Sequence, residues 1–336
     1  DFTSLSIEDM IAEEEMVLTI THNGYIKRTS LSTYRSQRRG GRGVQGASSR
    51  EEDFVEHLFV ANTHSYILFF TDKGKCYWVK VYDIPEGGRA AKGRAIVNLI
   101  GCEPDEKVSA FISVKEFNDD HYVVMATEKG MVKKTKLSAY SNPRKKGIYA
   151  VEIRDGDKLI EARVSTGDND ILLGTRNGKS IRFSEEQIRA SGRKTMGVKG
   201  ITLSSEDDRL VGMLLIKREG TVLVATEKGF GKRTEISQYR AQKRGGKGVL
   251  TMKTTDKVGK MVTIKEVVDK DDLMIITNQG VLIRLPVAQI RSIGRATQGV
   301  KLIKLGEGTL VSSITRIMSE EEEDENNNTE STEPKE

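Results

Sequence analysis

The sequence predicts an all-β protein made of six propeller-like blades, closed or nearly closed, with about four strands per blade and little helix. Two observations carry this prediction. A hairpin signal recurs six times at intervals of about 50 residues, and a second glycine follows each hairpin at a nearly fixed distance. Repeats of this length indicate solenoid or propeller arrays, and four short strands fit within one such repeat.

The first repeat opens with a hairpin signal. Asn23-Gly24 lies between two strand-like runs, 16–20 and 25–29. An Asn-Gly pair in this position is typical of a type I′ turn, whose two central residues need φ > 0. Strand-like runs precede a glycine at the same register in all six repeats. The turn glycines are Gly24, Gly74, Gly130, Gly178, Gly229 and Gly280.

Two positions after the turn glycine also repeat. The residue ten positions after it is apolar in every repeat, which indicates a place in the core, so we interpret the three tyrosines among them as packing residues and not as nucleophiles. These residues are Tyr34, Ile84, Tyr140, Ile188, Tyr239 and Ile290. The residue four positions after the turn glycine is basic in five of six repeats. It is Arg28, Trp78, Lys134, Arg182, Arg233 or Arg284.

A second glycine closes a basic segment in each repeat. It stands nineteen residues after the turn glycine in five repeats and seventeen after it in the third, at Gly43, Gly93, Gly147, Gly197, Gly248 and Gly299. We call the segment that ends at this glycine the basic glycine loop. The six loops span residues 37–43, 88–93, 144–147, 192–197, 242–248 and 294–299.

The first of these loops has the strongest phosphate-binding character. It reads Gln37-Arg38-Arg39-Gly40-Gly41-Arg42-Gly43 and has almost no apolar side chain to bury. Arginine offers a planar, permanently charged fork that suits phosphate. Glycine lets the backbone adopt φ > 0 and approach a partner closely. The loop is therefore a candidate for holding a polyanion.

Charge is distributed unevenly along the chain. The net charge is +5, but residues 319–336 contribute −8 and residues 1–15 contribute −6, which leaves +19 on residues 16–318. A basic body with an acidic tail is typical of proteins that bind nucleic acid. The sequence has no run of 18 apolar residues and no signal peptide, so we expect a cytoplasmic, nucleoid-associated protein.

These patterns predict three segments. An acidic lead-in occupies residues 1–15, the six-bladed domain occupies 16–318, and a disordered acidic tail occupies 319–336. Blade boundaries are offset if neighbouring blades exchange strands. The six blades fall roughly at residues 16–66, 67–121, 122–169, 170–219, 220–271 and 272–318.

Equivalent repeats place their basic loops at equivalent points around the ring, where they trace a positive belt. Six such loops in register favour a bound polyanion over six separately solvated loops. No segment reads as a recognition helix and no aromatic-studded strand suggests base stacking, so we expect bent duplex DNA bound through its backbone, largely without sequence specificity. Beyond residues 37–43, the predicted belt consists of Lys27, Arg28, Arg35, Arg89, Lys92, Arg94, Lys133, Lys134, Arg144, Lys145, Lys146, Arg182, Arg193, Lys194, Lys232, Arg233, Arg240, Lys243, Arg244, Lys247, Arg284 and Arg295.

Neither catalysis nor a bound cofactor or metal is predicted for this chain. Cys76 and Cys102 form no CxxC pair, and the four histidines show no metal-ligand spacing. Two segments look like phosphate loops, but 41–46 opens no helix and 174–180 falls on a hairpin turn. No Ser/His/Asp or Cys/His set is singled out by the repeats.

The residues quoted above carry a family resemblance. The loop at 37–43 matches the seven-residue box of the gyrase A protein residue for residue, and the six repeats resemble the C-terminal domain of DNA gyrase A over nearly the whole chain. The resemblance implies a β-pinwheel, a propeller in which neighbouring blades exchange strands. It also implies that the domain wraps DNA in a positive sense, so that ATP-driven strand passage elsewhere in the parent enzyme introduces negative supercoils. The tail then resembles a variable segment that modulates wrapping.

The resemblance also implies partners and leaves alternatives open. The implied partners are duplex DNA, the N-terminal breakage-reunion domain of the same polypeptide, and gyrase B, with ATP and Mg²⁺ used outside this domain and the isolated domain monomeric. The loop at 242–248 is close to a second box, either a second anchor or a less diverged repeat. The alternatives are the DNA-bending C-terminal domain of topoisomerase IV, which normally has a degraded box, and a protein-interaction propeller, which would show Trp-Asp signatures.

Overall fold

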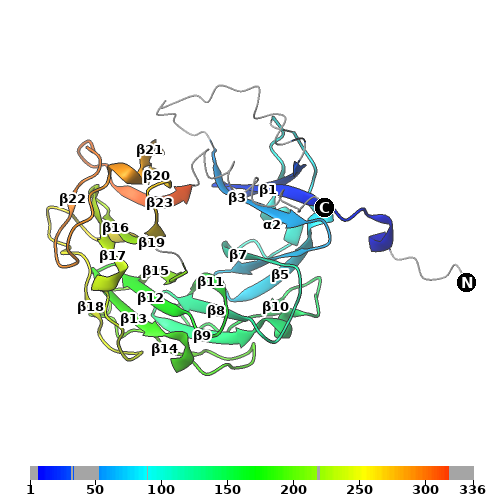
Figure 1. The fold of residues 1–336 in the computed structure, drawn as a ribbon, viewed down its shortest axis with the longest axis horizontal. Helices are drawn as coiled ribbons and strands as arrows, with labels where there is room; N and C mark the ends of the chain where they lie inside the picture. Colours follow the sequence, from blue (N-terminus) through cyan, green and yellow to red (C-terminus); the bar gives the residue numbers. More distant parts are fainter. Residues whose placement is uncertain (1–6, 32, 34–52, 89, 218–219, 318–336) are drawn as a thin grey trace, which may run out of the picture.

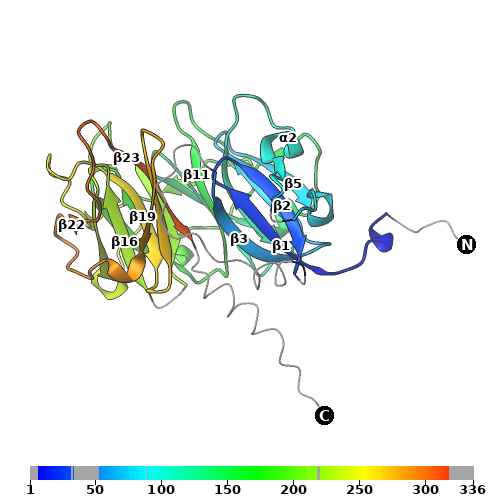
Figure 2. The same ribbon diagram turned by 90° about the horizontal axis from the view of Figure 1, so that it is seen from above.

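The structure, a computed structural model, describes residues 7–31, 33, 53–88, 90–217 and 220–317. Figure 1 shows the strands of this part of the chain gathered into six antiparallel sheets around a central axis. Figure 2 shows the ring edge-on, with the short 3₁₀ helix η1 (Ile7–Met10) outside it. No helix in the described residues is long and apolar enough to cross a membrane.

Each repeat supplies three strands to its own sheet. The first sheet contains β1 (Glu15–Thr21), β2 (Tyr25–Ser30) and β3 (Val55–Asn62). The second contains β4 (Tyr66–Thr71), β5 (Lys75–Lys80) and β7 (Val108–Val114). The third contains β8 (Tyr122–Thr127), β9 (Met131–Lys136) and β11 (Leu159–Ser165). The fourth contains β12 (Asp170–Thr175), β13 (Lys179–Ser184) and β15 (Leu210–Leu215). The fifth contains β16 (Thr221–Thr226), β17 (Phe230–Glu235) and β19 (Met261–Val267), and the sixth contains β20 (Asp272–Thr277), β21 (Leu282–Pro286) and β23 (Val311–Ile317).

A fourth strand comes to each of the first five sheets from the following repeat. The order β3-β1-β2-β6 in the first sheet places β6, which belongs to repeat two, at the edge beside β2. These exchanged strands are β6 (Arg94–Ala95), β10 (Ile148–Tyr149), β14 (Val198–Lys199), β18 (Val249–Leu250) and β22 (Val300–Lys301). The six-bladed all-β fold and the strand exchange implied by the family resemblance are confirmed. The sixth sheet has three strands among the described residues, and the segment of repeat one that corresponds to β6 falls outside them.

Short helical turns follow the strands of sheets two to six. A 3₁₀ turn follows the second strand in sheets two to six, and one short α-helix follows β6. These elements are η2 (Val81–Asp83), α2 (Ile96–Ile100), η3 (Leu137–Tyr140), η4 (Glu185–Gln187), η5 (Ile236–Gln238) and η6 (Val287–Gln289).

The six hairpins form where the turn glycines predict them, but the turn differs from the predicted type I′. The Gly24 N–H donates to the Thr21 carbonyl at 3.0 Å, which makes the glycine the fourth residue of the turn and not the third. Gly24 has a φ of 83°, and φ is also positive at the other five turn glycines. Ile20 pairs with Ile26, so five residues lie between the last paired positions of the two strands. The additional residue forms a β-bulge next to the glycine.

A threonine three positions before each turn glycine completes the hairpin, and this signal was missed in the sequence. In five of the six hairpins its hydroxyl accepts the N–H of the residue after the glycine, as Thr21 does from Tyr25 at 3.1 Å. The hydroxyl therefore satisfies a backbone donor that the turn leaves free. The six threonines are Thr21, Thr71, Thr127, Thr175, Thr226 and Thr277.

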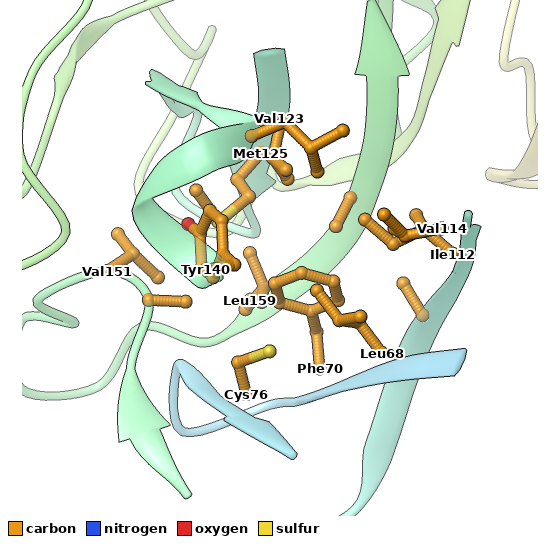
Figure 3. Close-up of a cluster of buried hydrophobic side chains, with 14 residues drawn as sticks. Leu68, Phe70, Cys76, Ile112, Val114, Val123, Met125, Tyr140, Val151 and Leu159 are labelled. Atoms are coloured by element: carbon orange, nitrogen blue, oxygen red, sulfur yellow. The ribbon is translucent and has the colours of Figure 1, made fainter. Parts of the chain in front are cut away.

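The hydrophobic core lies between consecutive sheets. Figure 3 shows the cluster between sheets two and three, where Phe70 and Tyr140 make an edge-on aromatic contact with centroids 6.0 Å apart. Among the described residues, five such clusters each join one sheet to the next. The apolar position ten residues after the turn glycine is buried in repeats two to six, so the packing interpretation is confirmed for Tyr140 and Tyr239. Tyr34 lies outside the described residues.

Candidate nucleic-acid interface

The basic glycine loops lie at the outer rim of the ring. Each of the five loops from repeats two to six ends at the second glycine, directly before an exchanged strand. The exchanged strand is the edge strand of its sheet on the side away from the axis, as Figure 1 shows for β10, β14, β18 and β22. Strand exchange therefore fixes every described loop on the perimeter, where a long ligand can reach several of them.

The second glycine is required by the neighbouring sheet. Gly197 has φ 79°, and a Cβ there would stand 2.2 Å from the Val132 carbonyl oxygen on β9. At Gly248 (φ 75°) the same atom would stand 2.3 Å from the Ser180 carbonyl oxygen on β13. No L side chain fits either position without moving the backbone. We expected these glycines to let the backbone approach a partner closely. At these two positions the close approach is to a strand of the preceding sheet.

Ten of the predicted belt cations are exposed at the rim. Repeats three and five contribute three each, on loops that project from the ring edge. The exposed residues are Lys92, Arg94, Arg144, Lys145, Lys146, Lys194, Arg240, Lys243, Lys247 and Arg284. Six others are half-buried, namely Lys27, Arg28, Arg182, Arg193, Arg244 and Arg295. These two groups are the predicted belt cations that keep solvent exposure in the described part of the chain, although Arg182 and Arg284 are paired with Asp170 and Asp272.

Four predicted belt residues are inside the fold. They lie on β9 and β17, whose outer faces are covered by the loop and exchanged strand of the following repeat. Their exposed fractions are 1% for Lys133, 6% for Lys134, 0% for Lys232 and 8% for Arg233. Side chains without solvent access cannot reach a ligand on the surface, and we leave these four out of the proposed contact surface.

The basic position four residues after the turn glycine joins neighbouring repeats. Arg28 donates from Nε to the Ile84 carbonyl at 2.6 Å, at the end of η2 in the next repeat. Arg182 donates to the Ile236 and Tyr239 carbonyls, each at 3.2 Å, around η5. A carbonyl oxygen has two lone pairs, so a guanidinium can donate to it even where, as at Ile236, it already accepts a backbone N–H. This part of the repeated signal is explained by blade assembly.

Two loop arginines also act between repeats. Arg244 donates from its guanidinium to the Gln187 carbonyl at 3.2 Å and to the Lys199 carbonyl at 2.6 Å. Arg295 makes the equivalent bonds to the Gln238 and Leu250 carbonyls. Each arginine keeps part of its surface at the rim while its fork holds the loop to the preceding repeat. Arginine thus stiffens these loops as well as charging them.

Lysine side chains hold three of the loops from beneath. The Lys232 ammonium on β17 donates to the Gly294 carbonyl at 3.0 Å and to the Thr297 carbonyl and hydroxyl at 3.0 and 3.1 Å, and it also reaches the Arg295 carbonyl. All of these oxygens belong to the loop of repeat six. An ammonium with three donors satisfies carbonyl groups that the loop itself leaves free.

Lys27 and Lys133 occupy the same place in repeats one and three. Lys27 donates to the Gly88 carbonyl at 2.9 Å and to the Ala91 carbonyl at 3.1 Å, and Lys133 donates to the Arg193 carbonyl. Burial lowers the pKa of Lys133 to about 7 and that of Lys232 to about 8. All three stand three residues after a turn glycine, a signal that was present in the sequence and that we missed.

Some predicted contacts lie outside the described residues. They are the loop at 37–43, Arg35 and Arg89. Their role as DNA contacts stays a prediction. Among the described residues, no group of three or more His, Cys, Asp or Glu side chains could hold a metal ion. Cys76 and Cys102 are free thiols, and Cys76 is buried.

Comparison with known proteins identifies the repeats. The family model described as "DNA gyrase C-terminal domain, beta-propeller" matches six segments, at residues 15–62, 65–115, 121–166, 169–217, 220–267 and 271–317. The chain is 47% identical over 320 residues to the DNA gyrase A protein of Staphylococcus epidermidis, and 47% identical over 319 residues to that of Staphylococcus aureus. Each alignment covers 94% of this chain and 36% of the relative, so the chain spans about a third of the length of these proteins.

Solved structures share the fold. The C-terminal domain of DNA topoisomerase IV superposes with a TM-score of 0.81 at 26% identity, over 93% of this chain and 95% of that one. A DNA gyrase A C-terminal domain superposes with a TM-score of 0.69 at 24% identity, over 91% of this chain and 100% of that one, a likeness that supports the fold alone. The family model covers all six sheets of the ring, and this chain belongs to the DNA gyrase C-terminal domain family.

Proposed function

We propose that this chain binds duplex DNA along its rim and bends or wraps it, largely without regard to sequence. The observation that carries the proposal is the set of exposed lysine and arginine side chains on the loops of successive repeats. Cations spaced around a convex edge suit a phosphate backbone that follows that edge. Bending 20–30 base pairs by 40–90° costs about 1–6 kcal/mol, which many distributed phosphate contacts offset.

We relate this DNA binding to the longer proteins that the chain resembles. The curated relatives are DNA gyrase A proteins, and we propose that the chain presents a wrapped segment for negative supercoiling by such an enzyme. Its partners would then be the breakage-reunion domain of the same polypeptide, and gyrase B, near the nucleoid. We propose that this domain is itself non-catalytic and needs no cofactor, with ATP and Mg²⁺ acting elsewhere in the parent.

The alternatives have less support. A topoisomerase IV domain shares the fold, but the relatives that match at 47% identity are gyrase A proteins, and the seven-residue box at 37–43 is intact in the sequence. A protein-interaction propeller is disfavoured because the chain holds one tryptophan, Trp78, and therefore no repeated Trp-Asp signature.

A topology assay tests wrapping directly. The chain is bound to nicked DNA circles, the nick is ligated, and the linking number is measured after the protein is removed. Wrapping predicts a change in linking number that grows with the protein-to-DNA ratio, whereas simple bending in a plane leaves it unchanged. Replacing Arg38, Arg39 and Arg42 by alanine should reduce the change while the cooperative thermal transition is kept. Unchanged linking number in the parent chain would contradict wrapping even if binding survived.

A further inference from the structure

Three lysines direct the peptide groups of alternate basic loops. Lys27, Lys133 and Lys232 lie on the second strands of repeats one, three and five, and their ammonium groups bond to carbonyl oxygens of the loops in repeats two, four and six. These bonds make the carbonyl groups point into the ring. The loops of even-numbered repeats therefore have a fixed polarity between their inner and outer sides.

The outer side of those loops carries peptide N–H groups. A peptide unit is planar and trans, so its C=O and N–H point in opposite directions. The carbonyl groups of Ala91, Arg193, Arg295 and Thr297 accept from the lysines, which turns the N–H of each following residue outward. The residues that carry these N–H groups are Lys92, Lys194, Ala296 and Gln298.

In the described part of the chain, these four N–H groups donate to no protein acceptor, and Lys92, Lys194 and Ala296 are exposed residues. Backbone N–H groups that face outward from a loop can donate to phosphate oxygens of a nucleic-acid backbone. The Lys92 and Lys194 side chains add positive charge at two of the three loops, which favours an anion over water.

We propose that Lys27, Lys133 and Lys232 are positioning residues which orient these loops so that backbone N–H groups bind phosphates of the DNA backbone. The proposal rests on the proposed function and deepens it, because it identifies part of the contact as main-chain recognition of phosphate. Each site takes one phosphate group. The lysine ammonium groups act from inside the ring and do not touch the DNA.

The remaining repeats supply a matched control. The positions that correspond to the three lysines are Tyr77 and Ile181 in repeats two and four, beneath the loops of repeats three and five. The Tyr77 ring lies against Gly147, and Ile181 lies 3.6 Å from the place of a Cβ on Gly246. Apolar and aromatic side chains cannot donate to loop carbonyl groups. In repeat five the Gly245 and Gly246 carbonyls accept from Thr202 instead, so this loop is held without a lysine.

Salt-dependent DNA binding separates main-chain from side-chain contacts. The double variant Lys133→Met, Lys232→Met keeps the stem of each side chain and removes the ammonium, and Ile181→Met is its control. We expect the double variant to bind duplex DNA at least roughly tenfold more weakly, because hydrogen bonds to charged acceptors are lost. The slope of log K against log salt should not change, because no surface cation is removed. Neutralising Lys92 and Lys194 to glutamine should instead lower that slope by about 0.9 each.

Two outcomes would overturn the inference. One is a double variant that unfolds cooperatively and binds DNA as tightly as the parent chain. The other comes from amide spectra of the parent chain with ¹⁵N-labelled lysine, in which the Lys92 and Lys194 N–H signals should move on addition of inorganic phosphate and not of chloride. Absence of that movement overturns the inference even if the double variant fails to fold. Failure of the parent chain to bind DNA would instead contradict the proposed function.

Discussion

The loops of odd-numbered and even-numbered repeats differ in what lies beneath them. In the even repeats the loop rests on a lysine ammonium, as the loop at 294–299 rests on Lys232. In the described odd repeats it rests on an aromatic or aliphatic side chain, as the loop at 242–248 rests on Ile181. Both loops nevertheless end at a positive-φ glycine directly before an exchanged strand.

This difference shows that the structural repeat and the chemical repeat have different lengths. The sheet recurs every 50 residues or so, but the lysine recurs every second sheet, and the core residue ten positions after the turn glycine alternates between tyrosine and isoleucine in step with it. Exposed cations alternate as well. The loops of repeats three and five carry more of them than the loops of repeats four and six. Exposed side-chain charge and lysine-bound carbonyl groups thus predominate in different loops of the ring.

The largest effect is expected at the glycine that both loop classes share. Gly197→Ala in an even repeat and Gly248→Ala in an odd repeat each place a Cβ within 2.3 Å of a backbone carbonyl, at φ 79° and 75°. The left-handed conformation alone costs about 1–2 kcal/mol, and relieving the overlap adds to it. We expect the free energy of unfolding to fall by at least about 2 kcal/mol in both variants, measured by urea denaturation.

A nearby glycine provides the control for that prediction. Gly192 has no positive φ, and a Cβ there would meet no atom within 4 Å. Gly192→Ala should therefore leave stability within about 0.5 kcal/mol of the parent chain. If Gly248→Ala were tolerated and Gly197→Ala were not, the two loop classes would differ in backbone path as well as in the side chain beneath the loop.

A smaller effect, on DNA binding, should separate the two classes. Replacing Arg144, Lys145 and Lys146 by glutamine removes three exposed cations from the loop of repeat three. Each cation that contacts a phosphate contributes about 0.9 to the slope of log K against log salt, so the slope should fall by up to about 2.7. Lys194→Gln in repeat four should lower it by about 0.9. A slope in the triple variant that equals that of the unmutated chain would show that the loop of repeat three does not contact the DNA.

The sequence was sufficient for the fold because hairpin and core signals are local. A turn glycine such as Gly178 specifies backbone conformation by itself, and an apolar residue in register such as Ile188 indicates burial. Whether a charged side chain is buried or exposed cannot be predicted from its local sequence in the same way. Lys232 and Lys247 are the same residue type, yet one is fully buried and the other exposed, because burial depends on which strand the next repeat lays over β17. A belt predicted from charge alone therefore combined exposed cations with buried side chains that join neighbouring blades.

The last effect is the pH dependence of stability, which tests whether the lysines are paired well enough to stay charged. Burial and Arg193 lower the pKa of Lys133 to about 7, and burial, Arg295 and Lys253 lower that of Lys232 to about 8. The ordinary pKa of lysine is 10.5. Between the lowered pKa values and 10.5, the unfolded chain therefore binds more protons than the folded one. The free energy of unfolding should therefore rise with pH from about 7 to about 10.

The double variant Lys133→Met, Lys232→Met lacks the two buried ammonium groups that cause the free energy of unfolding to rise with pH. We expect its denaturation midpoint to gain less than that of the parent chain between about pH 7 and pH 10, while Ile181→Met follows the parent chain. The loop carbonyl groups oppose the effect of burial, because they favour the ammonium over the neutral amine. Parallel curves for all three proteins would show that the carbonyls balance burial completely. The lysines would then hold the even loops unchanged across this pH range, and the contrast between the two loop classes would be independent of pH.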